Sequence, residues 1–244
     1  DEQLAFASSS IEIISYDVIS GTLLLTDDIV LLGGSTTNWD DSHIAIYNAS
    51  KNVSITVEPG ATLIIGNGCL IDALNGADQG LNYHFDVQPG AILSMTDSTM
   101  THCGTTGTGV GAGLYVNTTS AEIKRNTFTG NRYGLVLGPN SSLCEIWHND
   151  LYGNTEGNAR DDSVAADNRW DDGTWGNIWT PTALGWADAD DDGLGDAAYV
   201  LPGAASASDG RTLDGVTNVF VDDDYAHEAA FYFDTLVEAV AAVA

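Results

Sequence analysis

The chain has 244 residues, of which 35 are acidic and seven are basic, so its formal net charge at pH 7 is −28. Such a charge repels nucleic acid and anionic membrane surfaces, and we expect no nucleic-acid partner. No apolar run reaches the ~18 residues that a membrane span needs, so membrane insertion is not expected either. The sequence starts at Asp1 rather than Met, as expected for a secreted protein after signal removal.

Short apolar segments appear early in the chain, and two of them, residues 44–46 and 53–57, alternate with a period of two. They lie at residues 11–13, 23–25, 29–32, 44–46 and 53–57, with Gly and Asp turns between several of them. Alternation with a period of two is typical of strands that bury one face. The first quarter of the chain therefore predicts a series of short β-strands.

A first repeat follows these strands. Val57-Glu-Pro-Gly-Ala61 recurs 30 residues later as Val87-Gln-Pro-Gly-Ala91. Pro-Gly is a turn dipeptide, and alternating apolar residues follow each copy. This spacing is longer than that of the next repeat, so we expect an inserted loop, for which residues 75–80 are the candidate.

The clearest repeat lies between residues 121 and 154. Residues 123–131 (IKRNTFTGN) match residues 146–154 (IWHNDLYGN) at a spacing of 23, and residues 113–116 match residues 134–137 at a spacing of 21. A period of this length without helical periodicity predicts a solenoid whose coils bury their apolar faces by stacking. We expect about six or seven coils of ~22 residues between Ile11 and Asn154. Asn126 and Asn149, like Asn131 and Asn154, should then form hydrogen-bonded ladders at the bends.

This repeat resembles that of pectin-lyase-like proteins. The resemblance implies an all-β fold, a right-handed parallel β-helix, over residues 1–166. Residues 167–214, rich in Trp and Asp, resemble the C-terminal segment of NosD-like β-helix proteins, which are common on archaeal surfaces. NosD-like relatives are tied to copper-site maturation, but no residue here carries that role over.

An acidic loop in the second segment has the spacing of a calcium site. Asp188, Asp190, Asp192 and Asp196 occupy positions 1, 3, 5 and 9 of an EF-hand-type loop, and Gly193 occupies position 6. The backbone carbonyl of Leu194 would add a ligand, and this set of oxygens suits Ca²⁺. Tyr199 stands where such loops carry a bidentate Glu, so Asp171 or Asp172 would have to complete the shell. A solvated acidic loop without metal is the alternative.

Residues 215–244 resemble the way in which pectin-lyase-like domains begin. A strand that runs into three aspartates precedes a short predicted helix, in which Thr235 and Glu238 have capping-box spacing. The apolar positions expected to make contacts are Val219, Val221, Leu236, Val240 and Val243. No comparable helix precedes Ile11. The segment could cap its own C-terminal coil, open a further domain, or cap the first coil of the next subunit in a head-to-tail assembly.

Cysteines and glycosylation sequons give weaker indications. The chain has three cysteines, Cys69, Cys103 and Cys144, which predict buried free thiols or a disulfide between subunits. Asn-x-Ser/Thr sequons occur at Asn48, Asn52, Asn117 and Asn140 and permit glycosylation without demonstrating it.

Other candidate sites have plainer explanations. Trp170, Trp175, Trp179 and Trp186 could form a sugar-binding platform, but packing of an irregular segment also explains large rings. The paired carboxylates Asp161–Asp162 and Asp171–Asp172 could serve acid–base catalysis. The Gly-His-Gly and Arg-x-Lys motifs of polysaccharide-hydrolysing β-helix enzymes are missing, and a net charge of −28 would repel polyuronate, so we do not expect an enzyme. His102-Cys103 is a weak soft-metal candidate.

Taken together, the sequence predicts a right-handed parallel β-helix with an irregular calcium-loop segment and a short C-terminal helix. The expected role is structural: an extracellular, self-assembling subunit of an archaeal cell-surface layer, sheath or filament. A carbohydrate-binding surface module is the main alternative, and a polysaccharide lyase comes third.

Overall fold

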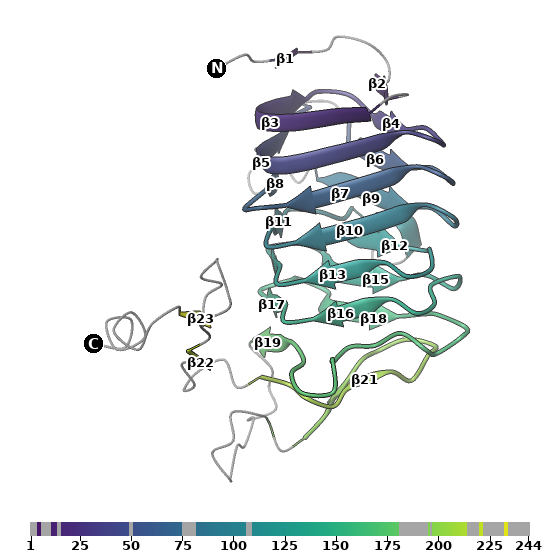
Figure 1. Cartoon of the computed structure of the whole chain (residues 1–244), viewed down its shortest axis with the longest axis vertical. Helices are drawn as coiled ribbons and strands as arrows, with labels where there is room; N and C mark the ends of the chain where they lie inside the picture. Colours follow the sequence, from purple (N-terminus) through teal and green to yellow (C-terminus); the bar gives the residue numbers. More distant parts are fainter. Residues whose placement is uncertain are drawn as a thin grey trace.

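The computed structural model describes residues 4–5, 11–13, 16–48, 51–74, 82–105, 109–180, 195, 197–213, 220–221 and 232–233. Within this part of the chain, successive coils stack along one long axis, and each coil places one short strand on each of three faces (Figure 1). All strand pairs between neighbouring coils are parallel. The architecture is a right-handed parallel β-helix.

The three faces are built as follows. Face 1 consists of the first halves of β3 (Tyr16–Leu25) and β5 (Thr36–Ile46), then β7 (Thr62–Gly66), β10 (Ile92–Thr96), β13 (Glu122–Lys124) and β16 (Glu145–Trp147). Face 2 consists of the second halves of β3 and β5, then β8 (Leu70–Ala73), β11 (Thr99–Thr101), β14 (Thr127–Thr129), β17 (Asp150–Tyr152) and β19 (Ile178–Thr180). Face 3 consists of β2 (Ile11–Ile13), β4 (Ile29–Leu31), β6 (Val53–Val57), β9 (Tyr83–Val87), β12 (Leu114–Val116), β15 (Tyr133–Leu137) and β18 (Gly157–Asp161).

From β5 to β18 the chain completes five coils, and β3 with β4 precedes them. The first bend joins face 1 to face 2, the second joins face 2 to face 3, and the third leads to face 1 of the next coil. The spacing between paired residues of neighbouring coils varies from 18 residues (Ile11 paired with Ile29) to 30 residues (Thr62 paired with Ile92). The longest coil contains residues 75–81, which lie outside the described part, as does the loop predicted within them.

The sequence repeats correspond to the observed strand register. Val57 pairs with Val87, Leu114 with Leu135, and Ile123 with Ile146, so all three predicted spacings are confirmed. Alternate side chains point inward and stack in columns. On face 1 the column is Ile65, Met95, Ile123 and Ile146, all fully buried. Stacking thus buries the apolar faces that a single coil would leave in water.

Residues 197–213 lie across the C-terminal end of the β-helix. β20 (Tyr199–Val200) pairs antiparallel with β21 (Ser208–Asp209), and Leu213 forms an isolated bridge with Ile178 of the last coil. Leu201 and Leu213 are buried there. Parallel pairing continues to β19, past residue 166, before this irregular closure begins.

The remaining described elements are short. They are β1 (Leu4–Ala5), the 3₁₀ turn η1 (Gly109–Gly111), and the parallel pair β22 (Phe220–Val221) and β23 (Tyr232–Phe233). The predicted C-terminal helix falls on residues outside the described part of the chain. Among the described residues, no helix is long and apolar enough to span a membrane.

Candidate functional site

A ladder of side-chain amides runs along the first bend. Asn149 Oδ1 accepts hydrogen bonds from the backbone N–H (3.0 Å) and the Nδ2 (3.1 Å) of Asn126 in the coil before it. Asn177 Oδ1 accepts the same two bonds from Asn149, at 3.0 and 2.9 Å. These side chains are buried, so each amide satisfies backbone groups that would otherwise lack a partner. The predicted ladder exists, and it continues to Asn177.

The ladder ends on the carboxylate of Asp209. Its Oδ2 accepts bonds from the backbone N–H (2.7 Å) and Nδ2 (3.1 Å) of Asn177 and from Nε1 of Trp179 (2.9 Å). Burial raises the pKa of Asp209 to about 6, although these donors act in the opposite direction. The close approach requires Gly176, because a Cβ at this position would lie 2.0 Å from Asp209 Oδ1. A carboxylate accepts but does not donate, so it terminates the ladder.

A second inward column also ends in an aspartate. Val116, Leu137 and Asp161 stack on face 3, and Asp161 is 1% exposed. Its Oδ2 accepts a bond from Nε1 of Trp170 at 3.1 Å, and its backbone bonds to Pro202 and Ala205 in the closing segment. In the last coil Asp161 therefore stands where the preceding coils have Val116 and Leu137, and donors of the chain itself bond to it.

The second bend carries its own amide ladder. Asn131 Oδ1 accepts the backbone N–H of Cys103 (2.8 Å), and Asn154 Oδ1 accepts that of Asn131 (3.0 Å). This ladder was also predicted from the repeat and is confirmed.

The three cysteines lie at the bends, each in a different coil. Cys69, Cys103 and Cys144 are free thiols and fully buried. Burial raises the pKa of Cys69 to about 11, and it also raises those of Cys103 and Cys144. The structure thus favours the buried-thiol alternative, because a disulfide between subunits would need a thiol at the surface.

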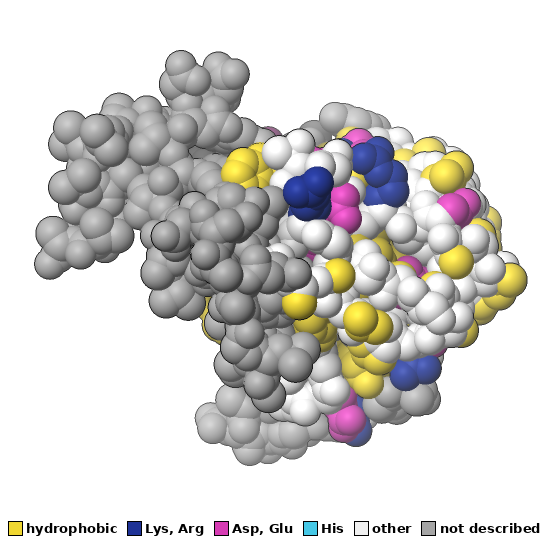
Figure 2. Space-filling model, turned by 90° about the horizontal axis from the view of Figure 1, so that it is seen from below, with side chains coloured by type: hydrophobic (Ala, Val, Ile, Leu, Met, Phe, Trp, Pro, Cys, Tyr) yellow, Lys and Arg dark blue, Asp and Glu magenta, His cyan; other side chains and the backbone are white. Residues whose placement is uncertain are grey.

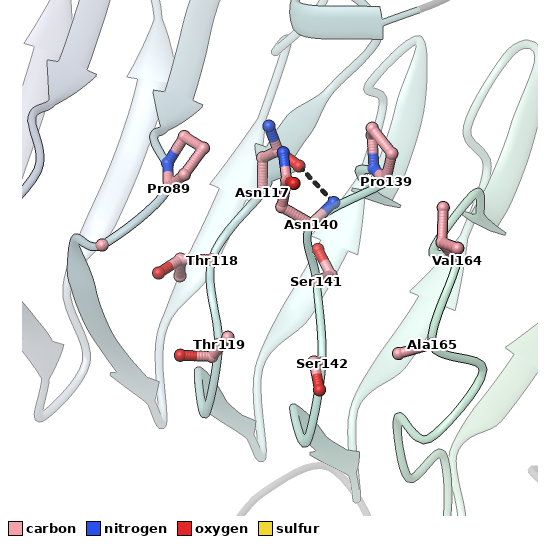
Figure 3. Close-up of a pocket in the computed structure, with 11 residues that line it drawn as sticks. Pro89, Asn117, Thr118, Thr119, Pro139, Asn140, Ser141, Ser142, Val164 and Ala165 are labelled. Carbon is pink, nitrogen blue, oxygen red and sulfur yellow. Dashed lines mark hydrogen bonds between the residues drawn. The ribbon is translucent and has the colours of Figure 1, made fainter.

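A groove of about 430 Å³ follows the third bend across neighbouring coils (Figure 3). Asn117, Thr118 and Thr119 come from one coil, and Asn140, Ser141 and Ser142 lie beside them in the next. Pro89, Pro139, Val164 and Ala165 complete the walls. The backbone N–H of Asn140 donates to Asn117 Oδ1 at 2.8 Å, which holds the two turns together.

The lining of this groove decides its chemistry. The hydroxyls of Thr118 and Ser141 point inward and donate to the carbonyls of Ala91 and Val116, both at 2.6 Å. None of the lining residues is titratable, so these walls cannot supply a general acid or base. The groove can offer hydroxyl, amide and small apolar contacts to a neutral group.

The predicted calcium site is not among the described residues. Asp188, Asp190, Asp192, Leu194 and Asp196 all lie outside them, as do Val219, Leu236, Val240 and Val243; Val221 lies in β22. Asp171 and Asp172 are described. Each caps a turn, with Asp171 Oδ1 accepting the N–H of Gly173 (2.9 Å) and Asp172 Oδ1 accepting that of Thr174 (2.7 Å).

Two of the four tryptophans of the predicted cluster pack in the interior. Trp170 and Trp179 are buried, with ring centroids 5.9 Å apart, and Trp179 stacks on Tyr199 at 4.1 Å. Buried rings cannot present a face to a sugar. Trp175 is half-buried, and Trp186 lies outside the described residues.

Asp150 on β17 is a half-buried carboxylate whose Oδ1 has no hydrogen-bond partner within the described structure. Burial raises the pKa of Asp150 to about 6. A carboxyl with a raised pKa contributes stability below its ordinary pKa and loses that contribution as the pH rises through about 6.

Asp150→Asn is therefore expected to be more stable than the wild type at pH 7.5, by about 1–2 kcal/mol. The difference should vanish near pH 4, where the wild-type carboxyl is protonated. Chemical denaturation of both proteins at the two pH values measures it, and an equal difference at both would contradict the assignment.

Comparison with protein families adds one match. The model of the NosD family, described as "Periplasmic copper-binding protein (NosD)", matches residues 86–183, from β9 to just past β19. This segment is NosD-like. The match covers less than half of the chain and coincides with its most regular coils. Comparison with curated proteins and with solved structures gave no significant match.

The family description names copper, so the described residues matter as possible copper ligands. Soft or imidazole ligands would be required, and the described residues contain no group of three or more His, Cys, Asp or Glu side chains that could hold a metal. His102 Nδ1 lies 2.8 Å from Asp72 Oδ1, whereas the neighbouring Cys103 is fully buried. The described part of the NosD-like β-helix does not fit a copper site.

Two elements of this region were not predicted from the sequence. Asn177 extends the first-bend ladder, and the order Gly176-Asn177-Ile178-Trp179 repeats the Asn-x-apolar pattern of Asn149-Asp150-Leu151. A search at a spacing of 28 residues would have found it. Asp209 carried no such signal, because it meets the ladder from outside the repeat.

Proposed function

We propose that this chain is an extracellular structural β-helix protein, a self-assembling subunit of an archaeal surface layer, sheath or filament with bound calcium. The matching family description names a periplasmic protein, which supports a location outside the cytoplasm. The regular ladders and the apolar columns support a scaffold role. Assembly through the ends of the β-helix is the central part of the proposal.

The observation that carries it is the closure of the C-terminal end by residues 197–213. Two inward columns end there on Asp161 and Asp209, and Trp170 and Trp179 cover them. The cap-like segment at residues 215–244 consequently has no open coil to cover at this end. Of the three alternatives for this segment, capping its own coil loses its target, which leaves a further domain and the first coil of a neighbouring subunit. The proposal takes the latter.

The opposite end offers an edge for such a contact. β3 pairs with β5 over nearly its whole length, but on its outer side the described pairing is limited to Leu23 and Leu24 with β1. An exposed strand edge is a template for another chain. Donor and acceptor on one chain would give a head-to-tail polymer.

A double variant and a matched single variant test this assembly. Leu236→Asp with Val240→Asp should convert polymers to monomers, because both positions lie on the apolar stripe of the cap-like segment. Val110→Asp, an exposed position on η1, is the matched control and should leave assembly unchanged. Sedimentation velocity with Ca²⁺ and after chelation provides the readout. Wild-type protein that stays monomeric under both conditions would refute the proposal.

Calcium in this proposal rests on the spacing of Asp188, Asp190, Asp192 and Asp196. Bound Ca²⁺ would reduce the charge repulsion between subunits that carry a net charge of −28 each. Chelation in the same experiment should therefore shift the sedimentation profile towards monomer.

A carbohydrate-binding surface module remains the second candidate. The groove at the third bend favours it, because hydroxyl, amide and proline groups line its walls. A glycan array with the wild-type protein and with Trp175→Ala separates the groove from the tryptophan platform. Binding that survives Trp175→Ala would favour the groove.

A further inference from the structure

The four glycosylation sequons differ sharply in their surroundings. Asn140 alone among the four asparagines is exposed; Asn48, Asn52 and Asn117 are half-buried. Asn48 Nδ2 donates to the carbonyl of Thr26 at 2.7 Å, and its Oδ1 accepts the N–H of Lys51 at 3.1 Å. Asn52 Oδ1 is buried.

Asn117 and Asn140 occupy matching turns of adjacent coils. Thr119 and Ser142 are the hydroxyl residues of these two sequons. Their backbones form an isolated parallel β-bridge between the two coils. Asn117 Oδ1 is held by the N–H of Asn140, whereas no hydrogen bond within the described residues involves the Asn140 side chain. Its amide nitrogen is thus the one sequon nitrogen that is both exposed and not engaged.

We propose that Asn140 carries an N-linked glycan and that the groove at the third bend holds the sugar nearest to the protein. Asn140 lies on the wall of this groove (Figure 3). Pro139 and Val164 provide apolar contacts for a sugar ring, and Val164 is 81% exposed without such a cover. Thr119 provides a hydroxyl, and Ser142 Oγ can accept a hydrogen bond while it donates to Asp167 Oδ2 at 2.9 Å. The uncharged lining fits a neutral first sugar.

The modification requires a sugar donor that is linked to a lipid diphosphate, together with a transferase on the extracytoplasmic side. The Asn140 Nδ2 forms a bond with C1 of the sugar while the bond from C1 to the diphosphate oxygen breaks. The lipid diphosphate leaves with the bonding electron pair, and the Nδ2 loses one proton to a base of the transferase. No oxidant or reductant is involved.

The glycan would also cover one side of the β-helix surface. Figure 2, which looks onto the C-terminal end, shows hydrophobic side chains (yellow) near the middle of this face and along its rim, and Lys and Arg (dark blue) in small separate groups. A glycan over the third bend would block contacts between subunits there and would leave the ends of the rod for such contacts. The inference shares with the proposed function only the location outside the cytoplasm.

Glycopeptide mapping of the protein isolated from its native cells tests the modification. We expect the glycan on Asn140, and Asn140→Gln should remove its whole mass from the intact protein. The matched Asn48→Gln variant should keep that mass. An unmodified Asn140 would overturn the proposal even if sedimentation shows assembly, so the two proposals fail separately.

Hydrogen exchange tests the place of the sugar. The backbone amides of residues 117–119 and 140–142 should exchange more slowly in the native protein than in the same chain made in cells that lack N-linked glycosylation. Residues 62–66 on face 1 serve as the internal control. Equal exchange at the third bend in both proteins would contradict a sugar in the groove.

Discussion

Replacing Asn149 with alanine is expected to lower the free energy of unfolding by about 4 kcal/mol, the largest effect that we expect of a single polar substitution among the described residues. Asn149 accepts two hydrogen bonds from Asn126 and donates to Asn177 Oδ1 and to the carbonyl of Ile123 (2.8 Å). The site is fully buried, so the groups left behind would have no water to bond. The lost bonds belong to three successive coils.

Chemical denaturation of the recombinant protein measures this effect. Asn140→Ala is the control, because it removes an exposed asparagine from a bend of the same β-helix and should cost under about 0.5 kcal/mol. A loss for Asn149→Ala as small as that of the control would show that the ladder contributes little to stability.

The second large effect is expected for Trp179→Ala. This side chain is 2% exposed, stacks on Tyr199 and donates its indole N–H to Asp209. Its removal leaves a cavity under the closing segment and a buried carboxylate with one donor fewer. We expect a loss of about 4 kcal/mol, together with faster proteolysis within residues 197–213.

Trp175→Ala gives the comparison for that result. Trp175 is half-buried, so its loss should cost less than half as much. Limited proteolysis followed by mass mapping locates the cleavage sites. If Trp179→Ala leaves residues 197–213 as resistant as in the wild type, the closing segment does not depend on this contact.

The regular part of the fold could be predicted because its repeats are local in the sequence. Ile123 and Ile146 share one inward column, and Asn126 and Asn149 share one bend, so the spacing of 23 residues translates directly into register. The coil length was less predictable: insertions between strands lengthen individual coils to 30 residues without disturbing the strand pairing. A β-helix tolerates such loops because only the strands and bends stack.

The closure of the C-terminal end could not be predicted in the same way. Asp209 meets Asn177 across a sequence separation of 32 residues, and no periodicity connects them. Asp161 illustrates a further difficulty: in the sequence it belongs to an acidic pair that could suggest catalysis, whereas in the structure it is buried beneath Trp170. In a chain this acidic, a buried structural carboxylate looks the same as an exposed one until the fold places it.

The sequons at the groove show which features of a motif the sequence predicts and which only the structure reveals. The sequons at Asn117 and Asn140 were visible, but their alignment on adjacent coils is seen in the isolated bridge between Thr119 and Ser142. The contrast between a held Asn117 and an exposed Asn140 depends on one backbone hydrogen bond. Such a bond has no signature in the sequence.

The most direct test of the account is electron microscopy of the wild-type protein in the presence of Ca²⁺. The proposed function predicts rods joined end to end, in which the closed C-terminal end of each subunit faces the β3 edge of the next. The Leu236→Asp/Val240→Asp variant should show single rods instead. Dispersed single rods at high protein concentration, with Ca²⁺ present, would contradict the central claim.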